Sequence, residues 1–350
     1  MAIAEIQETA AATTGTWGSQ ANTACSGGTR IVSSTAGATA TFSVSGRSCW
    51  LVSATQQAGG NYTVTVDGLP GVPGTCFGVG VAERHRTLFP LFRNLPDAAH
   101  SVVITATTSA PVALDSLLVV SGATIVPVAG SLAALGDSVT HGYGLTNPVS
   151  SWPSRLALLL GRKLSRPFAL SDKGISGDCL FGTDASHAGG MYRVFSDIAP
   201  LSPEVLTIMF GVNDIFLQTQ PSGEFAANLL SLLQLVEDLF AVAQMAVIVC
   251  TPPYVAPIGQ TCAPGGNQSG YYPGTANDHY RLAIEQVKQV ASMFGWANIA
   301  YTYECMDEAD SLIFPNGAFD STHPGDGGHG VMAIETFRSV LERFGKIGKA

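Results

Sequence analysis

Four short motifs contain the residue types that an acyl-transfer site needs. In chain order they are Gly136-Asp137-Ser138, Ser176-Gly177-Asp178, Gly211-Val212-Asn213-Asp214 and Asp320-Ser321-Thr322-His323-Pro324. They supply a nucleophilic serine, a backbone donor, a side-chain amide and an Asp/His pair. Each motif alone is weak evidence, because a Gly-Asp-Ser tripeptide is also a common turn before a helix. Together and in this order they predict nucleophilic catalysis on an acyl group.

The role of each residue follows from its chemistry. Ser138 is the expected nucleophile, and His323 is expected to take its proton and later return it to the leaving alcohol. Asp320, three residues before His323, is expected to fix the imidazole tautomer and to stabilise the imidazolium. Asn213 supplies an amide donor for the oxyanion, and Gly177, which lacks a Cβ, lets its backbone N–H approach a substrate closely. These residues suffice for the reaction, so we predict no cofactor and no metal ion.

Other polar residues could compete for these roles. His141 is an alternative base, but a helix after the nucleophile would direct it away or toward the pocket wall. His187 could line the pocket, although a solvated loop histidine is the more ordinary interpretation. His329, at the start of the last helix, is interpreted as structural or as part of the rim. Asp137 and Asp214 are interpreted as hydrogen-bond acceptors that order loops.

The chain after residue 122 alternates short apolar segments with amphipathic ones. Strands are predicted at 132–135, 205–210, 246–250 and 299–303, with a weaker strand at 168–170. Helices are predicted from apolar stripes at helical spacing: Phe225, Leu229, Leu232, Leu233, Val236 and Phe240; Tyr280, Ile284, Val287 and Ala291; and Ile334, Phe337, Leu341 and Phe344. This alternation implies a parallel sheet with helices on both faces. Ligands bind beyond the carboxyl ends of such strands, so the four motifs can meet at one edge of the sheet.

The first 125 residues are rich in Thr, Ser, Val and Gly and show no helical periodicity. Residues 61–68 place Tyr62, Val64 and Val66 on one face and end in an Asp-Gly turn. Similar runs occur at 40–44, 102–105 and 117–120. Short strands separated by turns predict an antiparallel sandwich or jelly roll, and residues 123–130 are expected to connect it to the remainder. We therefore predict a β-sandwich at 1–125 and an α/β catalytic domain at 126–350.

Composition limits the classes of partner. A chain of 350 residues fits two domains, and 46% apolar with 12% charged residues indicates a globular protein. A formal charge of −9 without a Lys/Arg cluster gives no reason to expect nucleic acid as a partner. No apolar run approaches the ~18–20 residues of a membrane span. Oligomeric state has no signature in this sequence.

The N-terminus and the cysteines bear on the compartment. Residues 1–8 lack a basic n-region and a continuous apolar segment, so they are not a signal peptide as written. The chain could be cytosolic, a mature form without its leader, or exported without one as virion proteins are; we take a secreted or virion-associated protein as the prediction. No C-x-x-C spacing indicates a metal or redox site, and Cys250 ends an apolar run typical of a buried thiol. Five other cysteines lie outside such runs and could form a disulfide or remain free: Cys25, Cys49, Cys76, Cys262 and Cys305.

Residues 132–350 resemble the SGNH (GDSL) hydrolase family. The resemblance is carried by the four motifs, extended to Val139-Thr140 and Gly174-Ile175, and by Trp152-Pro153 and Thr251-Pro252-Pro253. It implies a three-layer α/β/α, flavodoxin-like domain with a parallel sheet. It also implies a triad of Ser138, His323 and Asp320, and an oxyanion hole of Ser138, Gly177 and Asn213. Two positions depart from the family pattern: Val139 stands where Leu is commonest, and Ser171-Asp172 where an Asn often precedes the glycines.

The N-terminal part resembles sandwich modules fused to carbohydrate esterases and to virion-surface proteins, through residues 59–68, 100–104 and 114–117. This implies an accessory domain and an acetylated polysaccharide as the acyl-ester substrate. Trp17, Trp50 and Tyr62 could stack on sugar rings, although aromatic residues in a sandwich core are more common. A lipase or thioesterase, a glycan-binding or virion structural protein without catalysis, and an acyltransferase that uses a sugar as acceptor are the alternatives.

Overall fold

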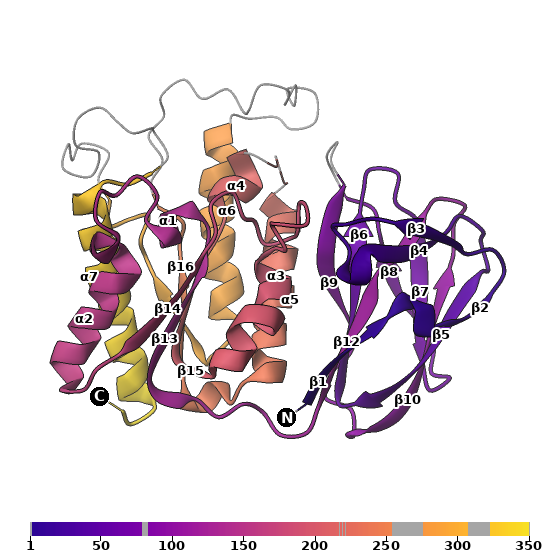
Figure 1. Ribbon diagram of the computed structural model, residues 1–350, viewed down its shortest axis with the longest axis horizontal. Helices are drawn as coiled ribbons and strands as arrows, with labels where there is room; N and C mark the ends of the chain where they lie inside the picture. The colour runs from indigo at the N-terminus through magenta and orange to yellow at the C-terminus, as the bar shows by residue number, and fades with distance from the viewer. Residues whose placement is uncertain are drawn as a thin grey trace. The chain divides into compact units, whose positions relative to one another are not determined.

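The computed structural model describes residues 2–78, 83–216, 218, 220, 222–253, 276–306 and 323–349. The chain divides into two compact units (Figure 1). The first contains Met1–Ile125 together with Phe181–Tyr192, and the second contains Val126–Leu180 and Arg193–Ala350. The chain therefore leaves the second unit after Leu180 and returns to it at Arg193.

The first unit is a β-sandwich, as predicted, and every strand pair described in it is antiparallel. Two larger sheets have the orders β1-β12-β6-β9 and β2-β5-β10-β7-β8, and a smaller sheet has the order β11-β4-β3. The strands are β1 (Ala2–Gln7), β2 (Ala12–Thr14), β3 (Gly18–Ala21), β4 (Thr29–Ser33), β5 (Thr39–Gly46), β6 (Ser48–Thr55), β7 (Asn61–Val66), β8 (Val72–Thr75), β9 (Arg84–Phe92), β10 (Ala98–Ala106), β11 (Val112–Leu114) and β12 (Ser116–Ser121). Two 3-10 turns, η1 (Glu8–Ala10) and η2 (Ser26–Gly28), interrupt the N-terminal part.

The two larger sheets share one apolar core. Phe42 and Ile104 from one sheet pack in the same cluster as Leu51 and Leu117 from the other, which is the arrangement of a β-sandwich.

The aromatic residues considered for sugar stacking belong to the interior of this unit. Trp50 is 0% exposed and Tyr62 is 2% exposed, while Trp17 is partly buried against the core. The structure therefore favours packing over sugar stacking for Trp50 and Tyr62, because a ring without exposed surface cannot meet a ligand.

The second unit contains a five-stranded parallel sheet. Its order is β14-β13-β15-β16-β17, formed by β13 (Val128–Gly136), β14 (Ala169–Gly174), β15 (Pro203–Met209), β16 (Ala246–Cys250) and β17 (Ala297–Ala300). Counted within the unit this is 2-1-3-4-5, the flavodoxin-like order, so the predicted fold class is confirmed. Strand β13 begins inside the segment expected to be a connection. Strand β17 ends before Tyr303, whose backbone N–H instead donates to Thr251 Oγ1 at 2.9 Å.

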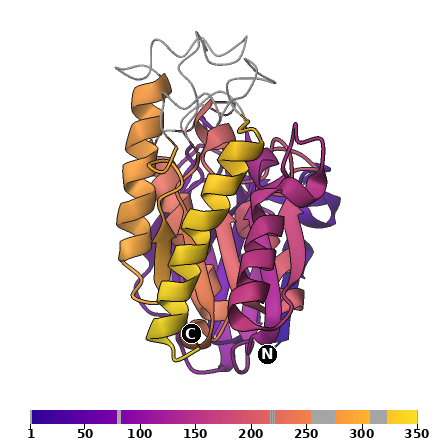
Figure 2. The same ribbon diagram turned by 90° about the vertical axis from the view of Figure 1, so that its left-hand side faces the viewer.

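Helices cover both faces of this sheet. Helices α2 (Trp152–Leu164) and α7 (Asp326–Lys346) pack together on one face, and α5 (Ser222–Leu239) and α6 (Ala276–Ser292) pack together on the other (Figures 1 and 2). Shorter elements lie between them: α1 (Ser138–His141), η3 (Pro148–Ser150), α3 (Gly190–Arg193), η4 (Val194–Ile198), η5 (Ala199–Leu201), α4 (Val212–Phe216) and η6 (Val242–Gln244).

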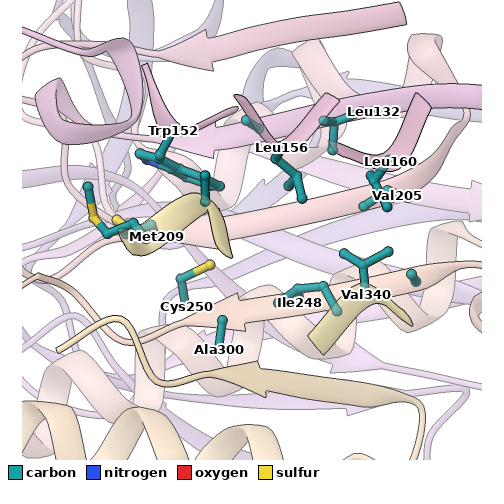
Figure 3. Close-up of a cluster of buried hydrophobic side chains, with 14 of the residues drawn as sticks. Leu132, Trp152, Leu156, Leu160, Val205, Met209, Ile248, Cys250, Ala300 and Val340 are labelled. Carbon is teal, nitrogen blue, oxygen red and sulfur yellow. The ribbon is translucent and has the colours of Figure 1, made fainter. Parts of the chain in front are cut away.

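Figure 3 shows the core between the sheet and the pair α2 and α7, where Leu132, Val205 and Ile248 meet Leu156 and Val340.

The buried face of α7 differs from the predicted one. Met332, Thr336, Val340 and Phe344 are buried, whereas Ile334 is 48% exposed. A hydrophobicity pattern does not count Thr336 as apolar, but its hydroxyl donates to Met332 O at 2.8 Å. This bond satisfies the hydroxyl within the helix, so the side chain can be buried. The predicted stripe was therefore wrong at Ile334.

No disulfide forms among the candidate cysteines that the structure describes. Cys25, Cys49, Cys76 and Cys305 are free, as is Cys250 in β16, and Cys262 lies outside the described residues. Burial raises the pKa of each of these five thiols above its ordinary value, which makes them unreactive. None of the helices described in the structure is both long and apolar enough to cross a membrane.

Candidate active site

Three strands of the parallel sheet end level with one another. Gly136, the last residue of β13, lies beside Gly174 of β14 on one side and Met209 of β15 on the other. The loops that follow these strands carry Ser138, Gly177 and Asn213, so the strand register alone brings three of the predicted site residues to one edge. The strand order reverses between β13 and β15, which is where ligands bind in sheets of this kind.

A tight turn presents Ser138 after β13. Asp137 caps the one-turn helix α1, and its Oδ1 accepts the Val139 N–H at 2.9 Å. A Cβ on Gly136 would lie 2.1 Å from Thr140 Oγ1 and 2.7 Å from Met209 O. A glycine is therefore required where the chain turns from strand to helix, which explains the first residue of the Gly-Asp-Ser motif.

The structure brings Ser138 and His323 into direct contact. Ser138 Oγ lies 2.7 Å from His323 Nε2, although the two residues are 185 positions apart. The centroids of the Tyr143 and His323 rings lie 4.7 Å apart, and the two ring planes are inclined at 47°. A hydroxyl bonded to an imidazole nitrogen is the geometry that general-base activation of a serine requires. Asp320 lies outside the described residues.

Two of the three predicted oxyanion donors, Gly177 and Asn213, lie on neighbouring loops. Gly177 has a φ of +84°, in the left-handed region that favours glycine, within a turn in which the Asp178 N–H donates to Ile175 O at 3.1 Å. Asn213 is 5% exposed, and its Nδ2 donates to Asp178 O at 2.9 Å. A side-chain amide nitrogen has two hydrogens, so this bond uses one of them and leaves one for a further acceptor.

The competing histidines are placed elsewhere. His141 is exposed at the end of α1, and His187 pairs with Asp184 at 3.0 Å within the first unit. His329 is fully buried, and its Nδ1 accepts the Trp152 N–H at 3.1 Å at the start of α2. Burial lowers the pKa of His329 to about 4. His329 is therefore a neutral structural residue.

Asp137 and Asp214 both accept backbone hydrogen bonds. Asp214 Oδ1 accepts the Leu180 N–H at 2.9 Å and so orders the segment after Gly177. Asp137 is 1% exposed, and its Oδ2 has no hydrogen-bond partner among the described residues. Burial raises the pKa of Asp137 to about 7, with the nearby carboxylates Asp214 and Asp178 adding to the effect.

Asp137→Asn should therefore remove a pH-dependent loss of stability. An unfolded Asp has a pKa of about 3.9, so the folded protein holds a proton on Asp137 that the unfolded chain has released between about pH 4 and pH 7. The contribution of this Asp137 proton to the free energy of unfolding is complete below pH 4. It falls by about 1.4 kcal/mol per pH unit as the pH rises toward 7. Asparagine keeps the capping acceptor but does not titrate. Urea unfolding at pH 5, 6, 7 and 8 should show a variant whose free energy of unfolding gains on the wild type up to pH 7 and levels off above it.

Asp326→Asn is the matched control. In the wild type the hydrogen bond from Arg155 Nη2 to Asp326 Oδ1 lowers the pKa of Asp326, so this carboxylate stays ionised across this range. Its difference from the wild type should not change between pH 5 and pH 8. A pH-independent difference for Asp137→Asn as well would show that Asp137 is already ionised in the folded protein.

One charged residue beside the site carried no signal in the sequence. Arg193 is 2% exposed, and its Nη1 lies 2.6 Å from Asp178 Oδ2. It belongs to none of the four motifs, although it lies only 15 residues after Asp178, so only its buried position reveals it.

No group of three or more His, Cys, Asp and Glu side chains in the described part of the chain is arranged to hold a metal ion.

Comparisons with known proteins bear on this site. Residues 134–331, more than half of the chain, match the model of the GDSL-like lipase/acylhydrolase family. A search of curated proteins finds no match.

Solved structures with a similar fold include a family two carbohydrate esterase from Clostridium thermocellum in complex with cellohexaose, with 17% identity, a TM-score of 0.43, and 94% of this chain and 100% of that chain covered. A family two carbohydrate esterase with a carbohydrate binding domain from Corynascus thermopiles has 14% identity, a TM-score of 0.44, and 98% and 100% covered. The M. smegmatis aryl esterase has 18% identity, a TM-score of 0.47, and 61% and 99% covered. Likenesses at this level carry no argument about substrate.

The family match spans the Ser138 turn, the Gly177 loop, Asn213 and His323, which are the same residues that the fold brings to one edge of the sheet. It confirms the family that the four motifs indicated. The chain belongs to the GDSL-like lipase/acylhydrolase family, whose members are carboxylic ester hydrolases.

Proposed function

We propose that this protein is a serine esterase that removes acetyl groups from a polysaccharide through an acyl-enzyme. The observation that carries the proposal is the 2.7 Å contact between Ser138 Oγ and His323 Nε2 at the carboxyl edge of the parallel sheet. Family membership provides the reaction class, and the resemblance of the N-terminal sandwich to modules of carbohydrate esterases provides the substrate class.

The proposed reaction has two steps. His323 takes the proton of Ser138 as Oγ attacks the ester carbonyl, and the imidazolium then protonates the leaving alcohol. Water then enters and attacks the acyl-enzyme as His323 takes its proton. The imidazolium returns this proton to Ser138 Oγ as the acid leaves, which restores the free serine and the neutral imidazole. Asp320 orients the imidazole and stabilises its charged form.

Negative charge develops on the carbonyl oxygen in both steps. The Ser138 and Gly177 backbone N–H groups and the Asn213 amide are proposed to bind this oxygen. The bond from Asn213 to Asp178 O fixes the plane of the amide before substrate arrives. Such preorganised donors stabilise the transition state more than the ground state.

The sandwich is proposed to be an accessory domain that favours polymeric substrate. Trp50 and Tyr62 are buried, so its binding surface would use other residues. An acetylated polysaccharide lies outside the cell, so we also propose that the protein acts as a secreted or virion-associated enzyme.

The acyl-chain preference of the full-length protein tests the substrate proposal. Initial rates with p-nitrophenyl acetate, butyrate and octanoate should fall sharply beyond acetate, because a site for acetyl groups has no room for additional methylenes. One methylene in a shaped pocket changes the rate by about 10- to 200-fold. Acetate release from an acetylated polysaccharide should exceed that from the monomeric ester at equal ester concentration. Faster hydrolysis of octanoate would support a lipase or thioesterase, and ester formation on an added sugar would support an acyltransferase.

A further inference from the structure

We propose that Arg193 is a positioning residue that holds the loop of Gly177 against the strand that carries Ser138. The inference rests on the proposed function, because it concerns the oxyanion donor of that site. Arg193 itself touches neither the nucleophile nor its base in the described contacts.

The Arg193 side chain joins three segments of the second unit. Its Nη2 donates to Lys173 O, directly before the Gly174-to-Asp178 loop, and its Nη1 donates to Asp178 Oδ2 at 2.6 Å, directly after Gly177. The same Nη1 lies 3.5 Å from Gly136 O, two residues before Ser138. One planar group therefore holds both ends of the loop and approaches the end of β13.

This ion pair is fully enclosed. The side chains of Arg193 and Asp178 are 2% and 0% exposed. Burying two charges is unfavourable unless their remaining hydrogen-bonding groups also find partners. Arg193 satisfies this condition, because its Nε donates to Asp197 Oδ2 at 3.0 Å in addition to the bonds above.

Asp178 links this ion pair to two of the three proposed donors, Gly177 and Asn213. It follows Gly177 directly, its carboxylate binds Arg193, and its backbone carbonyl accepts the Asn213 amide at 2.9 Å. A shift of Asp178 would move the Gly177 N–H and release the Asn213 side chain together. Displacements of about 1 Å at such donors can reduce the rate by about 100-fold.

Lysine cannot replace arginine in this arrangement. A lysine keeps the charge, but its ammonium is a compact point charge, whereas the guanidinium donates in several fixed directions within one plane. Arg193→Lys is therefore expected to keep an ion pair with Asp178 and to lose the simultaneous hold on Lys173 O and Gly136 O.

Arg343 offers a matched control within the same unit. It is also buried, at 5% exposure, and its guanidinium donates to the backbone carbonyls of Met245 and Val242 between α7 and η6. Arg343→Lys makes the same chemical change away from the candidate site. This variant should be less stable than the wild type but keep an unchanged oxyanion hole.

The test compares an acetate ester with the thionoacetate that carries sulfur in place of the carbonyl oxygen. Sulfur is a weak hydrogen-bond acceptor, so displaced donors should slow the oxygen ester more than the sulfur analogue. Arg193→Lys should lower kcat for the oxygen ester about 10- to 100-fold with little change in KM, and should reduce the oxygen-to-sulfur rate ratio. Arg343→Lys should leave that ratio unchanged. Partial unfolding lowers both rates equally, so the ratio is insensitive to it.

Asp178→Asn provides a second route if Arg193→Lys does not fold, because it keeps the shape and backbone carbonyl of residue 178 and weakens the bond to Arg193. It should reduce the ratio in the same direction. An unchanged ratio in the folded variant would overturn the positioning role.

Asn213→Ala separates this inference from the proposed function. It removes a donor directly, and it should lower the rate about 10²- to 10³-fold and reduce the ratio. If Asn213→Ala leaves the ratio unchanged, the proposed oxyanion hole is wrong. If Asn213→Ala reduces the ratio and Arg193→Lys does not, the oxyanion hole stands and only the inference about Arg193 fails.

Discussion

Replacing Ser138 by alanine is expected to lower kcat/KM for p-nitrophenyl acetate by about 10⁴- to 10⁶-fold. The acyl-enzyme cannot form without the Oγ that contacts His323 at 2.7 Å. The donors at Gly177 and Asn213 remain, so a small rate above that of buffer should persist from oxyanion stabilisation of direct attack by water. Initial rates of p-nitrophenol release, corrected for the rate in buffer, measure this change.

Ser339→Ala is the control for the loss of a buried serine hydroxyl. Ser339 lies on α7, where its Oγ bonds to the carbonyl of Ile299 at 2.9 Å. This variant should lose stability and keep the wild-type kcat/KM once corrected for the folded fraction. Wild-type activity equal to that of Ser138→Ala on both p-nitrophenyl acetate and acetylated polysaccharide would contradict the esterase proposal and leave a glycan-binding protein.

Replacing His323 by alanine is expected to reduce kcat/KM about as strongly as the loss of Ser138, by about 10⁴- to 10⁶-fold. Serine and histidine act as one unit, because the imidazole is the group that accepts the hydroxyl proton. The double variant Ser138→Ala/His323→Ala should therefore be no slower than either single variant. Steady-state rates of the three variants measure this non-additivity.

His187→Ala is the control for the loss of an imidazole, since His187 pairs with Asp184 in the first unit and should not affect p-nitrophenyl acetate hydrolysis. Asp320→Ala should reduce the rate less than His323→Ala, because solvent or a backbone carbonyl can partly replace an acceptor that only orients the imidazole. A His323→Ala variant that retains more than about a tenth of the wild-type rate would exclude it as the general base.

Local patterns predicted the two architectures well. The apolar segments at 205–210 and 246–250 are the buried central strands β15 and β16, and the alternation of residues 61–66 is strand β7 of the sandwich. These predictions succeeded because side-chain periodicity reports directly which face of an element is buried. The face of α7 was predicted wrongly where a polar residue, Thr336, is buried with its hydroxyl bonded to Met332 O.

The assignment of segments to units depended on contacts that local patterns do not contain. Phe181–Tyr192 belongs to the first unit, although it lies within the sequence of the second. Residues His85 and Gly182 exchange two backbone hydrogen bonds of 2.7 Å there. A backbone pairing between segments so far apart has no signature in side-chain periodicity.

The sequence by itself determined the residue types of the site and the strands that carry them. Ser138, Gly177 and Asn213 each follow a strand, and parallel strands place their carboxyl ends at the same edge of a sheet, so the meeting of these residues follows from the chain order. The tertiary structure decided the geometry, since only folding brings His323 Nε2 to Ser138 Oγ across 185 positions. It also decided the role of Arg193, whose partners include the backbone carbonyls of Lys173 and Gly136. Every residue has such a carbonyl, so the choice of partners depends on position in space and leaves no mark on residue type.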